Sequence, residues 1–318
     1  MKKLILLSVL IAVFSCKSAP KEVLKSITIT SEELKETVSY LASDSLLGRD
    51  TGSEGIAEAA AYLENQFIAS GVKPYFETYK DHFKVDSLDA FNVVGVIEGN
   101  DLKLKEEYII IGAHYDHIGI SKKIVDNDSI ANGANDNAAG TSSVIAMAKY
   151  FAAKKNNKRS LMFVLFSAEE KGLLGSKHLA EKLKAENINL YTMVNMEMIG
   201  VPFKDRDYIA FVTGYEMSNM AVKMNEYKGS KIIGFSEIAK KYNLFRQSDN
   251  YAFYETFKIP CQTISSCDLS NYDYYHHVDD EVDKLDYNHM ASLVNSIIPT
   301  LEKMSNTPTK EIRMNEAK

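Results

Sequence analysis

Five side chains that lie far apart in this sequence are of the types that bind divalent metal ions. They are two histidines and three carboxylates: His114, Asp136, Glu170, Glu197 and His276. Each alone has an ordinary structural explanation, since a histidine can be a satisfied core residue and an aspartate before a helix can be its N-cap. Together, two imidazoles and three carboxylates could surround a pair of divalent cations, with one carboxylate bound to both.

The positions of these residues follow the predicted strands. Apolar runs typical of strands occupy residues 108–112, 161–167 and 192–196, and polar groups come soon after each run. In order, these groups are His114 with Asp116, Glu169 with Glu170, and Glu197. Ligands of open α/β sheets bind outside the carboxyl ends of the strands. We therefore expect these side chains to meet at one edge of a sheet, with Asp136 and His276 reaching them from loops.

The charges of the expected ligands also match a pair of ions. Two zinc ions would carry four positive charges, and Asp136, Glu170, Glu197 and a bridging hydroxide would together carry four negative ones. A balanced cluster is tolerated in a partly buried cleft, whereas uncompensated charge there is costly. The cluster is therefore electrically consistent with two divalent cations.

Segments with strand-like and helix-like spacing alternate along most of the chain. Strands are predicted at 92–98, 108–112, 161–167, 192–196, 208–213 and 261–265, and helices at 138–153, 173–184, 216–227, 248–257 and 287–303. Earlier helices are predicted from Thr30, which has capping-box spacing to Glu33, to about Ala42, and from Ile56 to just before Gly71. This alternation predicts an α/β fold: a single three-layer domain over residues 28–304, in which helices cover both faces of a largely parallel mixed sheet.

The composition limits the possible functions. The chain has 318 residues, 45% of them hydrophobic, which is enough for one large core. Its net charge of −6 argues against nucleic acid as a partner. Cys261 and Cys267 flank a strand-like stretch that would hold them roughly 20 Å apart, too far for a disulfide. We therefore expect two thiols, and any zinc must be bound by histidine and carboxylate.

The two ends of the chain differ from its central part. Residues 1–15 have the basic, apolar and small-residue order of a secretory signal peptide. Cys16 ends a stretch that resembles the lipobox of bacterial lipoproteins, which implies a lipid anchor on Cys16, a tether over 16–27 and a location at the periplasm or outer membrane. An ordinary signal with an incidental cysteine is the alternative. The polar residues 305–318 predict a disordered tail.

Three motifs resemble those of a known family, the zinc aminopeptidases of metallopeptidase family twenty-eight, relatives of plasma glutamate carboxypeptidase. They are GAHYDH at 112–117, GANDNAAG at 133–140 and FSAEEKGLLGS at 166–176. Weaker matches lie at 44–49, 195–200, 248–249 and 275–280. The resemblance covers nearly all of the chain that follows the predicted signal. It implies a zinc-exopeptidase fold, two zinc ions and hydrolysis of peptide substrates, as an aminopeptidase.

The resemblance also implies how the ligands are divided. Matched by motif, His114, Asp136 and His276 are expected to bind one zinc ion. Asp136, Glu170 and Glu197 are expected to bind the other, so that Asp136 is the bridge. A cis peptide bond is expected after Asp136.

Further roles follow from the same resemblance. Glu169 would be the general base that removes a proton from water. Asp116 would accept the free ring N–H of His114 and so fix its tautomer. Tyr275 would stabilise the tetrahedral oxyanion. His117 lies near the first motif and is expected to be structural.

Three positions depart from the family pattern. Glu197 stands where the family usually has aspartate, and the extra methylene could shift the second ion. Asn250 stands where the family often has histidine. The pair His276 and His277 leaves the last ligand ambiguous, although the alignment favours His276.

Two other functions stay open as alternatives. A glutaminyl-peptide cyclotransferase of the same fold uses one zinc ion and a tryptophan-lined pocket, whereas this chain contains no tryptophan. A non-catalytic binding module that lost its metals is the second alternative, but every ligand position here keeps a competent side chain. The sequence does not separate aminopeptidase from carboxydipeptidase action.

Overall fold

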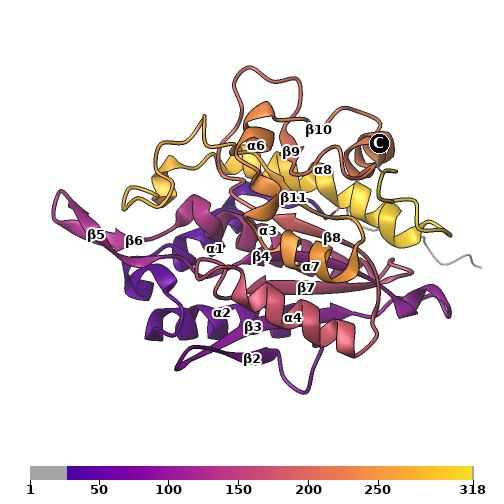
Figure 1. Cartoon of the computed structure of the whole chain (residues 1–318), viewed down its shortest axis with the longest axis horizontal. Helices are drawn as coiled ribbons and strands as arrows, with labels where there is room; N and C mark the ends of the chain where they lie inside the picture. The colour runs from indigo at the N-terminus through magenta and orange to yellow at the C-terminus, as the bar shows by residue number, and fades with distance from the viewer. Residues whose placement is uncertain (1–26, 317–318) are drawn as a thin grey trace, which may run out of the picture.

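A mixed β-sheet forms the centre of the molecule in the computed structural model, which describes residues 27–316 (Figure 1). Its strands lie in the order β1-β3-β7-β4-β8-β11-β9-β10, and β2 pairs with β3. They are β1 (Lys73–Pro74), β2 (Lys80–Val85), β3 (Leu88–Ile97), β4 (Glu107–His114), β7 (Ser160–Phe166), β8 (Asn189–Met196), β9 (Ala210–Val212), β10 (Ile233–Gly234) and β11 (Cys261–Ser265). The central strands β7, β4, β8 and β11 are parallel, and antiparallel pairs flank them. The predicted α/β class with a mixed sheet is confirmed.

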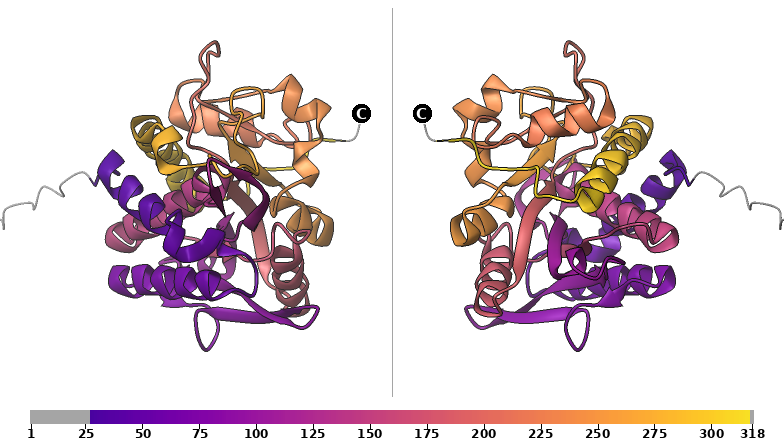
Figure 2. Two further views of the ribbon diagram at one scale, coloured as in Figure 1. Left: turned by 90° about the vertical axis from the view of Figure 1, so that its left-hand side faces the viewer. Right: turned by 90° about the vertical axis from the view of Figure 1, so that its right-hand side faces the viewer.

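Helices cover both faces of the sheet (Figure 2). One face is covered by α1 (Ser31–Leu41), α2 (Glu54–Ser70), α3 (Gly140–Lys154), α5 (Met220–Lys228) and α8 (Tyr287–Asn306), and the other by α4 (Leu174–Ala185) and α7 (Asn250–Phe257). Ile109 and Ile111 of β4 belong to the first apolar core and Ile110 belongs to the second. This alternation is expected of a strand buried on both faces, and it fixes the end of β4 in place.

The predicted start of α1 and the predicted end of α2 agree with the capping seen in the structure. Thr30 caps α1, and its hydroxyl accepts the N–H of Glu33 at 3.1 Å. Gly71 ends α2 with a φ of +74°, a left-handed conformation that glycine adopts without steric cost. Cys261 and Cys267 are both buried free thiols, as expected.

Several elements were not predicted. The edge strand β2 and the two-stranded hairpin of β5 (Gly119–Val125) and β6 (Asp128–Ala131) lack a continuous apolar run. The short helix α6 (Glu237–Lys241) packs near the β9 and β10 end of the sheet. In Figure 1 the β5–β6 hairpin extends away from the sheet.

The expected disordered tail is wrong for residues 305–316. Helix α8 continues to Asn306, and beyond it Ile312 is only 2% exposed. Its N–H donates to the hydroxyl of Tyr191 at 2.8 Å, and Met314 forms a bridge with Ser218. The buried side chain of Ile312 and these backbone contacts therefore keep the segment ordered, although its composition is mostly polar.

The predicted signal peptide and Cys16 lie outside the described residues, as does nearly all of the tether. Among residues 27–316, no helix combines the length and apolarity needed to cross a membrane.

Candidate metal centre

Polar side chains gather at the carboxyl ends of three adjacent parallel strands. β4 ends at His114, β7 is followed by Glu169 and Glu170, and β8 is followed by Glu197. Because β4 lies between β7 and β8, His114 has acidic side chains from both neighbours at its end of the sheet. Parallel pairing in this order thus brings residues from distant parts of the chain to one edge.

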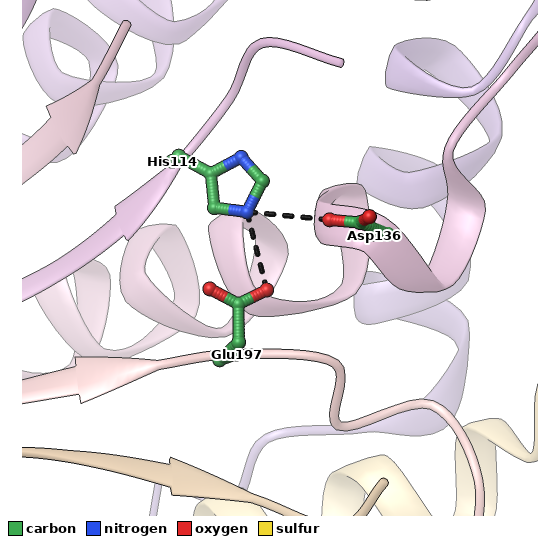
Figure 3. A group of neighbouring side chains, drawn as sticks. All are labelled: His114, Asp136 and Glu197. Carbon is green, nitrogen blue, oxygen red and sulfur yellow. Dashed lines mark hydrogen bonds and ion pairs between the residues drawn. The ribbon is translucent and has the colours of Figure 1, made fainter. Parts of the chain in front are cut away.

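Asp136 reaches this edge from the loop before α3, and each of its oxygens faces a different histidine. Oδ1 lies 3.3 Å from Nε2 of His114, and Oε1 of Glu197 lies 3.1 Å from the same nitrogen (Figure 3). The side chains of His114, Asp136 and Glu197 are 2%, 3% and 15% exposed. We call these three residues the first metal group.

The other oxygen of Asp136 belongs to a second cluster. Oδ2 lies 3.3 Å from Nε2 of His276, and Oε2 of Glu170 lies 3.0 Å from that nitrogen. Asp136, Glu170 and His276 form the second metal group. The ring of His117 adjoins it, with Nδ1 3.0 Å from Oε1 of Glu170.

The structure divides the ligands differently from the expectation. His114 was expected to share an ion with His276, and Glu170 with Glu197. Instead His114 faces Glu197, and His276 faces Glu170. Asp136 turns one oxygen toward each histidine, so the two histidines lie on opposite sides of the shared carboxylate. The order of the motifs along the chain does not contain this information.

The positions that depart from the family pattern have clear surroundings. Glu197 is longer than aspartate, and its Oε2 accepts a hydrogen bond from the hydroxyl of Ser248 at 2.7 Å, which leaves Oε1 facing the first metal group. Asn250 is buried and its amide donates to two main-chain carbonyls. His277 lies outside both groups and accepts a hydrogen bond from Lys123 at 3.2 Å.

The donor atoms fit zinc or a similar cation. His114, Asp136 and Glu197 bring one imidazole nitrogen and two carboxylates close enough to hold one ion, and His117, Asp136 and Glu170 do the same. His276 faces the same two carboxylates of the second group. One imidazole with two carboxylates is a common zinc ligand set. Oδ2 of Asp136 is buried and has no hydrogen-bond partner within residues 27–316. Burial raises the pKa of Glu169 well above its ordinary value, and Asp249 and Glu197 raise it further, although His114 opposes this. A divalent cation would relieve this concentration of negative charge.

Asp116 has a different role from the one expected. The nearest acceptor for Nδ1 of His114 is the backbone carbonyl of Asp116 at 3.1 Å, whereas the carboxylate lies 3.7 Å away. The carboxylate instead accepts the backbone N–H groups of Glu169 at 3.2 Å and Glu170 at 3.3 Å. Asp116 therefore fixes the ring of His114 through its main chain and the turn after β7 through its side chain.

The loop that carries Asp136 is held by a second carboxylate, Asp280. One oxygen of Asp280 accepts the N–H of Asn135 at 2.7 Å, and the other accepts that of Asp136 at 3.0 Å. The hydroxyl of Tyr272 donates to the same carboxylate at 2.6 Å. The peptide bond after Asp136 is cis, as expected. These contacts connect the Asp136 loop to the loop that carries His276.

Arg49 is a further organising residue that is fully buried. Burial lowers the pKa of its guanidinium to about 10, although Asp116 and Asp280 oppose the shift, so it stays charged at neutral pH. Its nitrogens donate to four main-chain carbonyls that belong to the loops around the site: Leu41, Tyr115, Asn132 and Gly133. Arg49 thus connects the segment after β4 to the segment before Asp136.

A pocket opens onto both metal groups. Its wall combines the carboxylates of the site, including Glu169, with apolar side chains such as Met198, Phe211 and Leu244. Tyr275 also lines the pocket, and its ring stacks on that of His276 with centroids 3.9 Å apart. No arginine or lysine is among the described residues that line it. The pocket therefore combines carboxylates, uncharged polar side chains and apolar side chains, without a lysine or arginine among the described residues.

The model of peptidase family M28 matches residues 92–300, which include all the residues of both metal groups. The chain belongs to peptidase family M28.

Individual M28 relatives resemble parts of the chain. A probable leucine aminopeptidase of Trichophyton verrucosum is 26% identical over 268 residues, which are 81% of this chain and 66% of the relative. Aminopeptidase YwaD of Bacillus subtilis is 30% identical over 169 residues, 52% of this chain and 33% of the relative. The chain thus spans less than two thirds of the length of these relatives.

Solved structures share the fold at low identity. BSAP, a zinc aminopeptidase from Bacillus subtilis, superposes with a TM-score of 0.69 at 13% identity, covering 92% of this chain and 100% of that one. A glutaminyl cyclase from Porphyromonas gingivalis gives a TM-score of 0.68 at 12% identity, covering 88% and 100%. The M28 fold therefore occurs with both activities, and the site has to distinguish them.

Sequence reasoning missed three residues that support this M28 site. Arg49 and Asp280 stand inside weakly matching motifs, but their partners are backbone atoms of other loops, which leave no trace in residue types. His117 stands in the first motif, and its proximity to a predicted ligand was the available signal. Its partner Glu170 lies 53 residues further along the chain.

Proposed function

We propose that this M28 chain is a zinc-dependent aminopeptidase that binds two zinc ions and releases N-terminal residues from peptides. The observation that carries the proposal is the pair of adjoining groups that share Asp136, with Glu169 on the wall of the same pocket. His114, Asp136 and Glu197 would hold one ion, and Asp136, Glu170 and His276 the other. Zinc bound there would polarise a substrate carbonyl and lower the pKa of water.

Glu169 is the proton carrier in this proposal. It lies on the pocket wall, and burial raises its pKa, which makes its carboxylate a stronger base. The carboxylate takes a proton from water as the water oxygen bonds to the scissile carbonyl carbon. It then gives that proton to the amine nitrogen as the carbon–nitrogen bond breaks.

Tyr275 would stabilise the negative charge that develops on the carbonyl oxygen. Burial raises the pKa of its phenol, and the charges of Asp136 and Glu170 raise it further, so the hydroxyl keeps its proton. Stacking against His276 holds the ring over the second metal group. A protonated phenol in this place can donate a hydrogen bond to an oxyanion.

The charge of the pocket supports aminopeptidase over carboxydipeptidase action. A carboxypeptidase has to bind the negative C-terminus of its substrate, which a nearby cationic side chain favours. The described residues that line this pocket include no arginine or lysine, and Glu169 is a lining carboxylate that is not among the proposed zinc ligands. Such surroundings favour the positively charged N-terminus of a peptide and disfavour its negatively charged C-terminus.

The proposal is tested by Glu169→Gln, measured on an aminoacyl-nitroanilide, its N-acetylated analogue and a free peptide. The variant should keep its zinc content but lose about 10²- to 10⁴-fold in kcat, because general acid–base catalysis contributes on that scale. Glu181→Gln, on an exposed face of α4, serves as the control. Wild-type turnover in Glu169→Gln, or activity that survives removal of all divalent ions, would refute the proposal. Ammonia release from glutaminyl peptides without peptide cleavage would indicate a cyclotransferase.

We also propose, from the sequence alone, that a lipid on Cys16 anchors the enzyme at the periplasmic or outer membrane surface. Cys16→Ala should move the protein from the membrane fraction to the soluble fraction and abolish incorporation of labelled fatty acid. An unchanged distribution would contradict the anchor.

A further inference from the structure

His117 occupies a place beside the second metal group that neither the sequence nor the family model assigns. Its ring is fully buried, and Nδ1 lies 3.0 Å from Oε1 of Glu170 and 3.7 Å from Oδ2 of Asp136. The ring meets that of His276 edge-on, with centroids 5.7 Å apart. Two imidazoles therefore face Glu170, one at each carboxylate oxygen.

The ring of His117 is held in place by its surroundings. Its backbone N–H donates to the carbonyl of Arg49 at 3.3 Å. The ring packs against Gly133, where an added Cβ would come within 2.5 Å of the histidine Cγ. Gly133 also has a φ of +58°, so both the space and the backbone there suit glycine. The orientation of Nδ1 toward Glu170 is thus built into the loop packing.

We propose that His117 is a positioning residue for the second metal position. It donates its Nδ1–H to Oε1 of Glu170 and so directs Oε2 toward the ion that Asp136 and His276 share. The inference rests on the proposed function, because it requires an ion at that position. Ligating carboxylates commonly receive such a hydrogen bond from a neighbouring group.

The partners of the ring favour this role over direct coordination. If Nδ1 bound a metal, Nε2 would carry the proton, yet Nε2 is buried and lacks a partner among the described residues. Buried N–H groups without an acceptor are rare. His114 differs, since its Nε2 faces two carboxylates while its Nδ1 has the carbonyl of Asp116 at 3.1 Å. The environment of His114 is that of a ligand, and that of His117 is that of a donor.

Stepwise titration of the metal-free full-length protein with Co²⁺ tests the inference, with binding followed by visible absorption and by competition with a chelator. His117→Leu and His117→Gln should weaken the second binding step by about 10- to 100-fold and leave the first step unchanged. His117→Asn should stay close to wild type, because its amide nitrogen occupies nearly the place of Nδ1. The amide of glutamine lies further from the backbone and does not reproduce that donor.

His178→Asn is the matched control, because His178 also faces a carboxylate, that of Asp81 at 3.3 Å, but belongs to neither metal group and does not line the pocket. It should leave both binding steps unchanged, and thermal unfolding of each metal-free variant verifies folding. Wild-type binding by His117→Leu would overturn the inference, and so would an equal loss in His117→Asn, which would mean direct coordination. If wild-type protein binds only one ion, the two-zinc proposal fails, which is a separate and distinguishable result.

Discussion

The two metal groups share Asp136 but differ in how their other ligands are held. His114 and Glu197 leave the ends of adjacent parallel strands, and both are largely buried. His276 belongs to the loop between β11 and α8, its side chain is 36% exposed, and its φ is +54°. Side chains on strands are positioned more rigidly than those on loops. The first metal group is therefore set by the sheet, and the second depends on loop contacts.

The loop contacts that support the second group are numerous. Asp280 holds the Asp136 loop through two backbone N–H groups, and Tyr272 donates to Asp280. Tyr275 stacks on His276, and His117 faces Glu170. A metal ligand on a loop thus needs contacts with several neighbouring side chains to hold its position, whereas a ligand at a strand end is held by the sheet. We expect the second position to be the weaker and more easily perturbed of the two.

The largest effect is expected from a change at Asp136, the ligand that both metal groups share. Asp136→Asn takes one negative charge from both positions, so both binding steps should weaken by more than the 10- to 100-fold typical of residues that only support a ligand. Activity should fall below detection. Isothermal titration with Zn²⁺ and a peptidase assay measure the two effects.

Asp81→Asn is the control for Asp136→Asn. Asp81 is equally buried, but it pairs with Lys182 and accepts from Asn92 away from the site. This variant should lose stability and keep both ions. Should Asp136→Asn weaken only one binding step, Asp136 is not shared and the two groups are independent sites.

The sequence predicts the strands and strand-end residues of the site well, and it predicts the arrangement of the loops poorly. The strand predicted at 261–265 has those bounds in the structure, and α1 begins after the predicted cap Thr30. These elements have local causes, namely apolar runs and capping side chains. The strand-end residues were located because parallel strands place their carboxyl ends together. The end of the sheet that carries the site therefore follows from short-range patterns.

The division of ligands depends on geometry that no local pattern contains. Which oxygen of Asp136 faces which histidine is determined by the path of the His276 loop over the site, and it differs from the pairing that the family resemblance implied. The β5–β6 hairpin was missed for a related reason. Its first strand contains charged residues such as Lys122 and Lys123, which interrupt the alternation of apolar and polar residues that would indicate a strand. Pairing with its partner strand, and not burial, defines that element.

Substitution of His276 or of the adjacent His277 tests the second metal group separately from the first. His276→Ala should abolish the second binding step and leave the first, because only Asp136 is common to both groups. Activity should fall at least as far as in Glu169→Gln if both ions take part. Metal content by mass spectrometry and Co²⁺ absorption report the loss independently of activity.

His277→Ala is the matched control, since His277 follows in the chain but faces Asp279 and Lys123 outside both groups. It should bind both ions as the wild type does. The opposite pattern, with metal lost in His277→Ala and kept in His276→Ala, would mean that the loop turns the other histidine toward Glu170. In that case His277 would replace His276 as the loop-borne ligand of the second group, and the contrast with the strand-borne first group would rest on that residue. The first binding step is the internal reference, because the sheet that holds His114 and Glu197 contains neither substituted position.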